Sequence, residues 1–170
     1  LAIVVQRYGA DISGGAELHA RYIAERLSSR IQVRVLTTCA RDHLRCRNEF
    51  PAGADEVNGI PVERFRVARE RSIRDFGIRS RRVFTRFHSL QEELEWLDSE
   101  GPRSPELIAH IRQVREDFDF FVLFSYRYYH AWHGSRAIAD KAVLVPTAER
   151  DDAIGVSIFA PVFRGVRALM

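Results

Sequence analysis

The sequence has few of the features that would assign it to a specialised class of protein. Its two cysteines, Cys39 and Cys46, are too few for a disulfide framework, and their spacing matches no zinc site. The apolar run Phe120–Phe124 is far shorter than the ~20 residues that a membrane-spanning helix needs. The chain has one lysine, Lys141, and 25 arginines, a bias that indicates genomic base composition. The pI near 9.2 is therefore a weak argument for nucleic-acid binding. We therefore expect a reduced, cytoplasmic protein with no nucleic-acid partner.

The length of 170 residues, with 46% hydrophobic residues, suits a single domain with its own core. The opening run Leu1–Val5 predicts a core strand, because it follows no basic segment and precedes no cleavage site; we expect no secretory signal. The chain starts without methionine and stops on Gly165–Met170, a pattern typical of the beginning of a strand. We expect residues 1–170 to be a piece of a longer protein.

Apolar runs and helical spacings alternate along the chain. Strands are predicted to begin near Leu1, Ile31, Ile60, Phe118, Ala142 and Val166, and helices are predicted over residues 15–28, 80–97, 104–116, 130–139 and 153–163. Residues 39–57 predict a long polar loop, followed by a tight turn at Asn58-Gly59. Pro61 places the strand after that turn at a sheet edge, or else marks the strand boundary. The order predicts an α/β fold: a Rossmann-like, doubly wound, mainly parallel sheet with helices on both faces.

The turn after the first strand contains Gly14-Gly15 at the start of a helix, where backbone amides can approach an anion closely. It is not a Gly-x-Gly-x-x-Gly fingerprint, and the second strand ends at Thr38-Cys39 without the acid that would bind a dinucleotide ribose. No Gly-Lys-Ser/Thr is present to form a nucleoside-triphosphate loop. The alternative is a tight turn in which Ser13 caps the helix.

Several blocks together resemble the family 4 glycosyltransferases. They are Val4–Gly9, Ser13–Glu17, Ala24–Ser28, Val33–Ala40, Val57–Phe65 and Val145–Glu149, in the order expected for that family and over nearly the whole chain. The glycine block and the Pro146-Thr147-Ala148 block are fairly specific together, and either alone is weak. The resemblance implies a retaining enzyme of GT-B architecture, in which two Rossmann-like domains face each other across a cleft.

Under this resemblance, residues 1–170 form the amino-terminal, acceptor-binding half, and its partners are a carboxyl-terminal donor-binding domain and a glycan or lipid-linked acceptor. Gly14 and Gly15 would contact the phosphate or sugar of a nucleotide-sugar donor. In that family a Glu-x7-Glu element of the second domain binds the donor. The same spacing occurs here at Glu17 and Glu25 and at Glu92 and Glu100, and both occurrences are interpreted as accidental. No lysine or arginine lies between Asp11 and His19, so a diphosphate would need cations from the other domain. No metal or other cofactor is implied.

Two further segments supply candidate acceptor-binding residues. Ser125–His133 follows a predicted central strand, and its aromatic and imidazole groups suit a sugar, so we assign Tyr126, Tyr128 and His130 to acceptor binding. The alternative is that these aromatic side chains pack the following helix. Thr147 and Glu149 follow the next strand and are assigned to the same cleft, whereas Asp151 and Asp152 are interpreted as a solvated turn. No catalytic residue is assigned, because in retaining enzymes of this kind the leaving phosphate can take the acceptor proton.

Nine arginines lie between Arg64 and Arg86. If one helix spans residues 80–97, Arg81, Arg82 and Arg86 crowd its positive end while acidic residues crowd its negative end. An anionic acceptor, or an anionic lipid surface at the inner face of a membrane, would relieve that clash. The alternative is a solvated face on which the arginines pair with nearby acids.

The leading functional hypothesis is therefore the acceptor domain of a retaining glycosyltransferase for a surface polysaccharide or glycolipid. A stand-alone α/β module that binds a small anion or a partner without catalysis is the first alternative. Half of a sugar-nucleotide epimerase is another.

Overall fold

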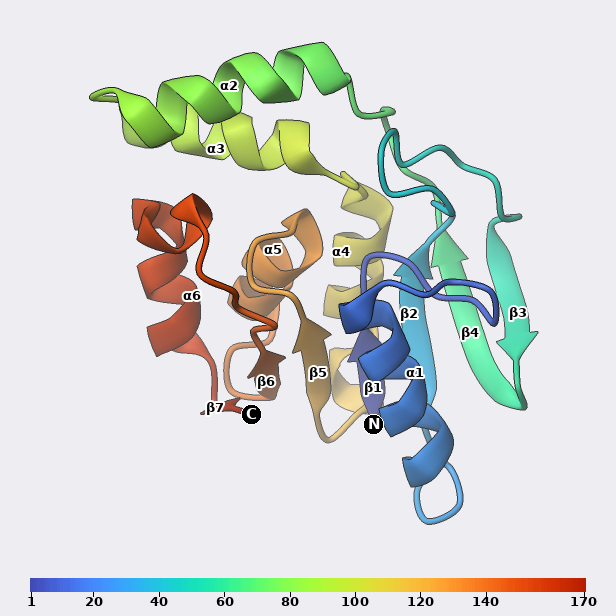
Figure 1. Cartoon of the computed structure of the whole chain (residues 1–170). Helices are drawn as coiled ribbons and strands as arrows, with labels where there is room; N and C mark the ends of the chain where they lie inside the picture. Colours follow the sequence, from blue (N-terminus) through green and yellow to red (C-terminus); the bar gives the residue numbers. More distant parts are fainter.

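In the computed structural model, which describes residues 1–170, seven strands form one sheet in the order β3-β4-β2-β1-β5-β6-β7 (Figure 1). The strands are β1 (Ala2–Val4), β2 (Arg34–Thr38), β3 (Gly53–Val57), β4 (Ile60–Phe65), β5 (Phe121–Phe124), β6 (Ala142–Val145) and β7 (Ala168–Leu169). Every neighbouring pair is parallel except β3 and β4. The predicted Rossmann-like, mainly parallel α/β sheet is confirmed.

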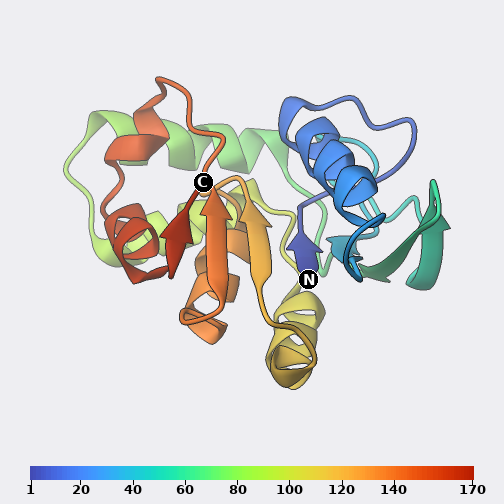
Figure 2. The ribbon, with the colours of Figure 1, turned by 90° about the horizontal axis from the view of Figure 1, so that it is seen from below.

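Helices cover both faces of the sheet. They are α1 (Gly15–Leu27), α2 (Ile73–Thr85), α3 (Leu90–Glu100), α4 (Pro105–Gln113), α5 (Tyr129–Ala137) and α6 (Ala160–Gly165). Seen from below, α1 lies on one face of the sheet, and α4 and α5 lie on the other (Figure 2). Successive residues of β1 alternate between the two cores: Ala2 and Val4 pack on the side of α4 and α5, whereas Ile3 packs against the side of α1. This burial on both faces explains the continuous apolar runs of the central strands.

The predicted loop over residues 39–57 is wrong at its end, because β3 forms there and pairs antiparallel with β4 through the turn at Asn58-Gly59. β3 is almost entirely exposed and polar, so it carries no apolar alternation that could have revealed it. β4 is consequently an inner strand. The sheet-edge interpretation of Pro61 is therefore wrong. Pro61 is the second residue of β4 and is tolerated because the pairing of β4 with β2 begins only at Val62.

The single helix predicted over residues 80–97 is also wrong, because two antiparallel helices occupy this region. α2 ends where Arg86 adopts an extended conformation, and α3 begins at a capping box formed by Ser89 and Glu92. The two helices lie beyond the carboxyl ends of the parallel strands (Figure 1). The segment α2–α3, residues 73–100, is called the helical hairpin below.

The charge clash that motivated an anionic partner for Arg81, Arg82 and Arg86 therefore does not exist. Each helix of the hairpin has acidic residues in its first turn, and α2 has Arg82 in its last turn, so these charges complement the helix dipoles. Asp98 and Glu100, in the last turn of α3, oppose the dipole of their helix. Arg82 donates to Glu92 at 2.7 Å across the hairpin, as the alternative interpretation expected. Arg81 and Arg86 are exposed and form no ion pair. Contact of these arginines with an anionic acceptor or lipid surface stays a prediction, without the helix-dipole argument behind it.

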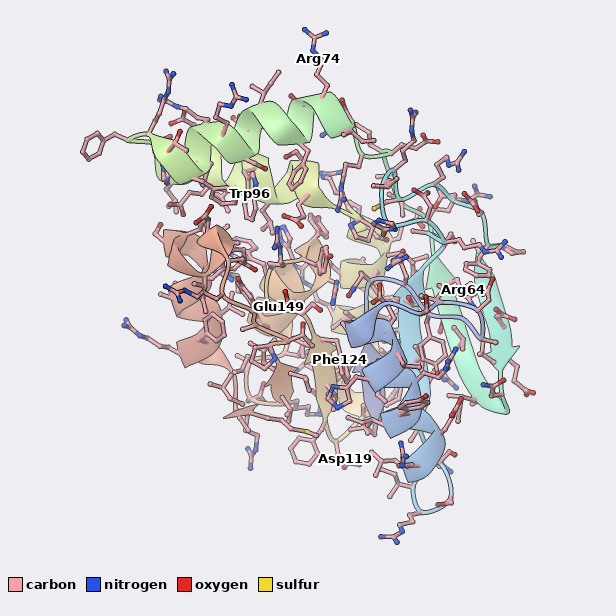
Figure 3. All side chains as sticks on the ribbon, in the orientation of Figure 1. Arg64, Arg74, Trp96, Asp119, Phe124 and Glu149 are labelled. Atoms are coloured by element: carbon pink, nitrogen blue, oxygen red, sulfur yellow. The ribbon has the colours of Figure 1, made fainter.

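Trp96 anchors the hairpin to the rest of the chain. Its side chain is fully buried, its indole Nε1 donates to Ser80 Oγ at 3.0 Å, and its ring packs edge-on against Phe159 at 6.0 Å. In Figure 3, Trp96 lies beneath α2, whereas Arg74 points outward from the opposite side of that helix. The helix predicted over residues 153–163 is interrupted: two short 3-10 turns precede α6. No helix in the structure combines the length and the apolar character needed to cross a membrane.

Candidate functional site

The strand order reverses between β1 and β5. The chain passes from β1 through α1 to β2 on one side, and β5 later joins β1 on the other side. In an open parallel sheet, such a switch point leaves a crevice at the carboxyl ends of the strands, where ligands bind. A cavity of about 680 Å³ lies there. It is lined by residues that follow β1, β2, β5 and β6 and by the first turn of α1. This volume falls in the usual range for small-molecule sites, ~300–1,000 Å³.

The glycine turn forms one wall of this cavity. Gly14 is the N-cap of α1 and makes no side-chain cap, so Ser13 does not cap the helix as the alternative interpretation proposed. The first amides of the helix therefore have no side-chain acceptor and lie at the cavity wall. A Cβ built on Gly15 would meet no atom within 4 Å, so the backbone at Gly15 is open for close approach of a ligand.

Gly14 has a different reason to be glycine. A Cβ there would collide with the carboxylate of Glu17, which is almost fully buried and forms an ion pair with Arg7. Glu17 lies in the first turn of its own helix, where its charge complements the dipole. The sequence motif Gly14-Gly15 thus combines one position that makes room for an internal ion pair and one that faces the cavity.

Arginines line the cavity, although none lies between Asp11 and His19. Arg7, Arg41 and Arg127 come from the segments that follow β1, β2 and β5. The expectation that all cations near the glycine turn must come from another domain is corrected in this respect. Each guanidinium is nevertheless paired: Arg7 with Glu17, Arg41 with Asp11, and Arg127 with both Glu100 at 3.1 Å and Asp151 at 3.2 Å.

The opposite wall is built by the segments after β5 and β6. Ser125 and Thr147, with φ of 65° and 45°, both adopt the left-handed conformation that is uncommon outside glycine. Their hydroxyl groups are 2.7 Å apart, so the two strand ends are tied together at the cavity. Strained backbone of this kind concentrates at ligand sites, and here it turns two hydroxyl-bearing residues toward each other.

Tyr126 and Tyr128 also line the cavity. Tyr126 is buried, and its hydroxyl donates to Asp151 Oδ1 at 3.1 Å. Burial, reinforced by the neighbouring Asp151, raises the pKa of Tyr126, and burial likewise raises the pKa of Tyr128. Both phenols are neutral at physiological pH; the hydroxyl of Tyr126 is engaged by Asp151, and that of Tyr128 can donate a hydrogen bond. Asp151, interpreted from the sequence as a solvated residue, holds both Tyr126 and Arg127 in position.

The structure brings most of the predicted site residues together. Gly14, Gly15, Tyr126, Tyr128, Thr147 and Glu149 line the same cavity. Glu149 is exposed, and in the view of Figure 3 it lies between the carboxyl end of β5 and the hairpin. Arg81, Arg82 and Arg86 lie on the hairpin and do not line the cavity.

His130 does not line the cavity. It is fully buried on α5, and its Nε2 donates to the carbonyl oxygen of Phe124 at 2.7 Å. Burial lowers the pKa of His130 to about 4, so the imidazole is neutral at pH 7. The position of His130 supports packing of the helix, the alternative interpretation of the aromatic cluster, and not acceptor binding.

Several polar residues that line the cavity were not assigned to the site from the sequence, among them Gln6, Arg7, Arg41, Arg127 and Asp151. They follow a parallel strand within a few residues, and the carboxyl ends of parallel strands meet at one edge of the sheet. That rule alone could have identified them. Nowhere in the chain do three or more histidine, cysteine or acidic side chains gather closely enough to bind a metal ion.

Comparison with protein-family models, with curated proteins and with solved structures found no match for this chain. The cavity and its residues are therefore the basis for the functional proposal that follows.

Proposed function

We propose that residues 1–170 form the acceptor-side domain of a retaining glycosyltransferase, which transfers a sugar from a nucleotide-sugar donor to a glycan or lipid-linked acceptor. One observation carries the proposal. The two sequence blocks with the most specific resemblance to that family, Ser13–Glu17 and Val145–Glu149, lie far apart in the chain and meet at one cavity. Both blocks follow parallel strands, whose carboxyl ends meet at one edge of the sheet, and Gly14, Gly15, Thr147 and Glu149 from these blocks line the cavity at that edge.

The chemistry of the cavity supports a sugar as its ligand. Tyr128 provides an aromatic side chain with a hydroxyl group, Ser125 and Thr147 add two more hydroxyls, and helix α1 adds backbone amides. Tyr126 also borders the cavity, but it is buried and its hydroxyl is bonded to Asp151. Aromatic faces and converging polar groups are the combination that recognises a sugar ring. The three arginines at this cavity are each paired with a carboxylate, so a donor diphosphate would draw further cations from a second domain.

The direct test uses the longest natural polypeptide that contains residues 1–170. Incubated with labelled nucleotide sugars and a glycan or lipid-linked acceptor, it should release nucleoside diphosphate and label the acceptor. Residues 1–170 alone should transfer no sugar and should bind nucleotide sugars only weakly, because half of the cleft is missing. Calorimetry that measured micromolar binding of a nucleotide sugar to residues 1–170 would contradict the assignment of donor binding to a second domain.

A specific observation also favours the alternative of a small-anion module, namely the uncapped N-terminus of α1 beside three arginines. Under that alternative, inorganic phosphate should bind to residues 1–170 more tightly than any neutral sugar does. Titration of both kinds of probe under the same conditions distinguishes the two functions.

We expect the substitution Gly15→Ala to weaken ligand binding at least ~tenfold while the fold stays as stable as before. The added methyl group meets no protein atom, and alanine is favoured over glycine in a helix by about 1 kcal/mol. The methyl group would, however, stand between the ligand and the amides of α1. Calorimetric titration with the best-binding methyl hexopyranoside, together with thermal unfolding, measures both effects.

The matched control is Gly77→Ala on the exposed face of α2. A Cβ there also meets nothing within 4 Å, but Gly77 is remote from the cavity lining. This variant should be at least as stable as the unchanged chain and should bind the sugar as the unchanged chain does. Equal affinity of both variants would show that ligands do not approach the backbone at Gly15.

A further inference from the structure

Gln6 is a buried polar residue whose side chain the fold does not use. It follows β1 directly, is 4% exposed and lines the cavity at the switch point. Its backbone carbonyl is held by the hydroxyl of Thr38 at 2.6 Å. Its side-chain Oε1, by contrast, is buried and has no hydrogen-bond partner.

An unpaired buried carbonyl is costly. Removing an amide oxygen from water without a compensating hydrogen bond costs roughly 1–3 kcal/mol, and most buried polar atoms in folded proteins are paired. Methionine or leucine would fill the same volume without that cost. Because Gln6 borders a cavity, the partner for Oε1 is best sought in a ligand, and an oxygen that can only accept requires a ligand that donates, such as a hydroxyl group.

The charges around the cavity argue against an anion as that ligand. Four carboxylates and three guanidinium groups line it: Asp11, Glu17, Glu149 and Asp151, with Arg7, Arg41 and Arg127. All three guanidinium groups are paired with carboxylates, although the buried Nε of Arg127 has no hydrogen-bond partner, whereas Glu149 forms no ion pair. Gln6 Oε1 and the Glu149 carboxylate have unused acceptor capacity for hydroxyl groups, and Arg127 Nε can donate to the oxygen atom of a hydroxyl group.

Donors for the oxygen atoms of such a ligand are present on the other wall. The first amides of α1, at Gly15 and Ala16, border the cavity and have no side-chain acceptor. A hydroxyl group both donates and accepts, so one polyhydroxylated ring satisfies the amides of α1 and the acceptors Gln6 and Glu149 at once.

We infer that this cavity binds an uncharged, hydroxyl-rich ring of the size of a hexopyranose, and that Gln6 is a specificity-determining residue that accepts a hydrogen bond from one ring hydroxyl. The inference rests on the proposed function and specifies the chemical class of the acceptor: the acceptor presents a neutral sugar unit to this domain, not a phosphate. The amides at the glycine turn then contact sugar hydroxyls.

The test compares Gln6→Met with the unchanged chain. Methionine keeps the length of the side chain and removes the unpaired oxygen, so the variant should unfold at the same temperature or higher. Its affinity for the best-binding member of a series of methyl hexopyranosides, measured by calorimetry, should fall at least ~tenfold. Gain of stability with loss of binding is the signature of a functional residue, because a structural glutamine would lose stability when replaced. Gln113→Met, an exposed residue at the end of α4, is the matched control and should change neither quantity.

Monodeoxy derivatives of the same sugar identify the hydroxyl involved. To the unchanged chain, one deoxy sugar should bind more weakly than its parent sugar. To Gln6→Met, that deoxy sugar and its parent should bind equally well, because the hydrogen bond between residue 6 and this hydroxyl is already lost. If the parent sugar binds and Gln6→Met binds it equally well, or if the variant is clearly less stable, the role of Gln6 is refuted while the proposed function stands. If inorganic phosphate binds and no hexopyranoside does, the proposed function fails and the inference fails with it. Absence of binding by every probe up to its solubility limit also refutes a neutral-sugar site.

Discussion

Lowering the pH from 6.5 to 4 should destabilise the folded chain by roughly 3 kcal/mol through His130 alone. Burial lowers the pKa of His130 from its ordinary 6.5 to about 4, against the opposing effect of its hydrogen bond to Phe124. In the unfolded chain the imidazole takes up a proton near pH 6.5, whereas the folded chain resists protonation until about pH 4. Between these values the unfolded state binds more protons, so stability falls as the pH falls. Denaturant unfolding at a series of pH values measures the slope.

His133, on the same helix, contributes in the same direction, because partial burial lowers its pKa to about 4 as well. The substitution His130→Gln separates the two residues. The glutamine amide can still donate to the Phe124 carbonyl but does not titrate, so part of the acid sensitivity should disappear and the His133 part should remain. His43→Gln, at an exposed position, should retain the full pH dependence. An unchanged slope in His130→Gln would show that His130 is accessible to protons in the folded chain.

The central sheet could be predicted because its strands are the most apolar segments of the chain. β1, β5 and β6 are buried along nearly their whole length, and the chain order of strands and helices determines a parallel, doubly wound arrangement. β3 could not be predicted in the same way. Its residues are exposed, and it forms because β4 offers an unpaired edge directly after a tight turn, a reason that lies in the neighbouring strand.

The hairpin shows how a continuous apolar spacing can mislead. Val83, Phe87, Leu90, Leu94 and Leu97 lie at helical spacing, yet Phe87 is fully exposed in the turn between two helices. The local signal that separates the two helices is the capping box Ser89-x-x-Glu92, which is present in the sequence. Once the helix is divided, Arg82 and Glu92 become neighbours across the hairpin.

Part of the candidate site could be predicted from the rule that residues after the carboxyl ends of parallel strands meet at one edge of the sheet. That rule correctly grouped Gly14, Gly15, Tyr126, Tyr128, Thr147 and Glu149. It could not separate His130 from the tyrosines, because the face of α5 that packs on β5 depends on the tertiary arrangement. Nor could it show that Gln6 is left without a partner or that Arg127 is held by Glu100, since such pairings become visible only when the side chains are packed.

The second large effect is expected for Glu93, which ties the hairpin to the segment before α6. Its buried carboxylate accepts hydrogen bonds from Ser157 Oγ at 2.6 Å, from the amide of Ile158 at 2.9 Å and from His88 Nε2 at 2.9 Å. Burial alone would raise the pKa of Glu93, but these hydrogen bonds outweigh it and lower the pKa. The substitution Glu93→Leu should therefore destabilise the chain by roughly 3–5 kcal/mol, because buried donors lose their acceptor. Chemical denaturation measures the loss.

Glu95→Gln on the same helix is the control for Glu93. Glu95 is exposed and pairs with Arg79 at the surface, so its replacement should have little effect on stability. Glu93→Gln should fall between the two variants, because the amide oxygen can still accept from Ile158 while the amide nitrogen faces a donor. The segment that Glu93 holds continues from the cavity residues Glu149 and Asp151, so Glu93→Leu should also weaken sugar binding before the chain unfolds. If Glu93→Leu proved as stable as Glu95→Gln, the hydrogen bonds of Glu93 would not hold the hairpin, and its other contacts, such as those of buried Trp96 and the Glu100–Arg127 ion pair, would suffice.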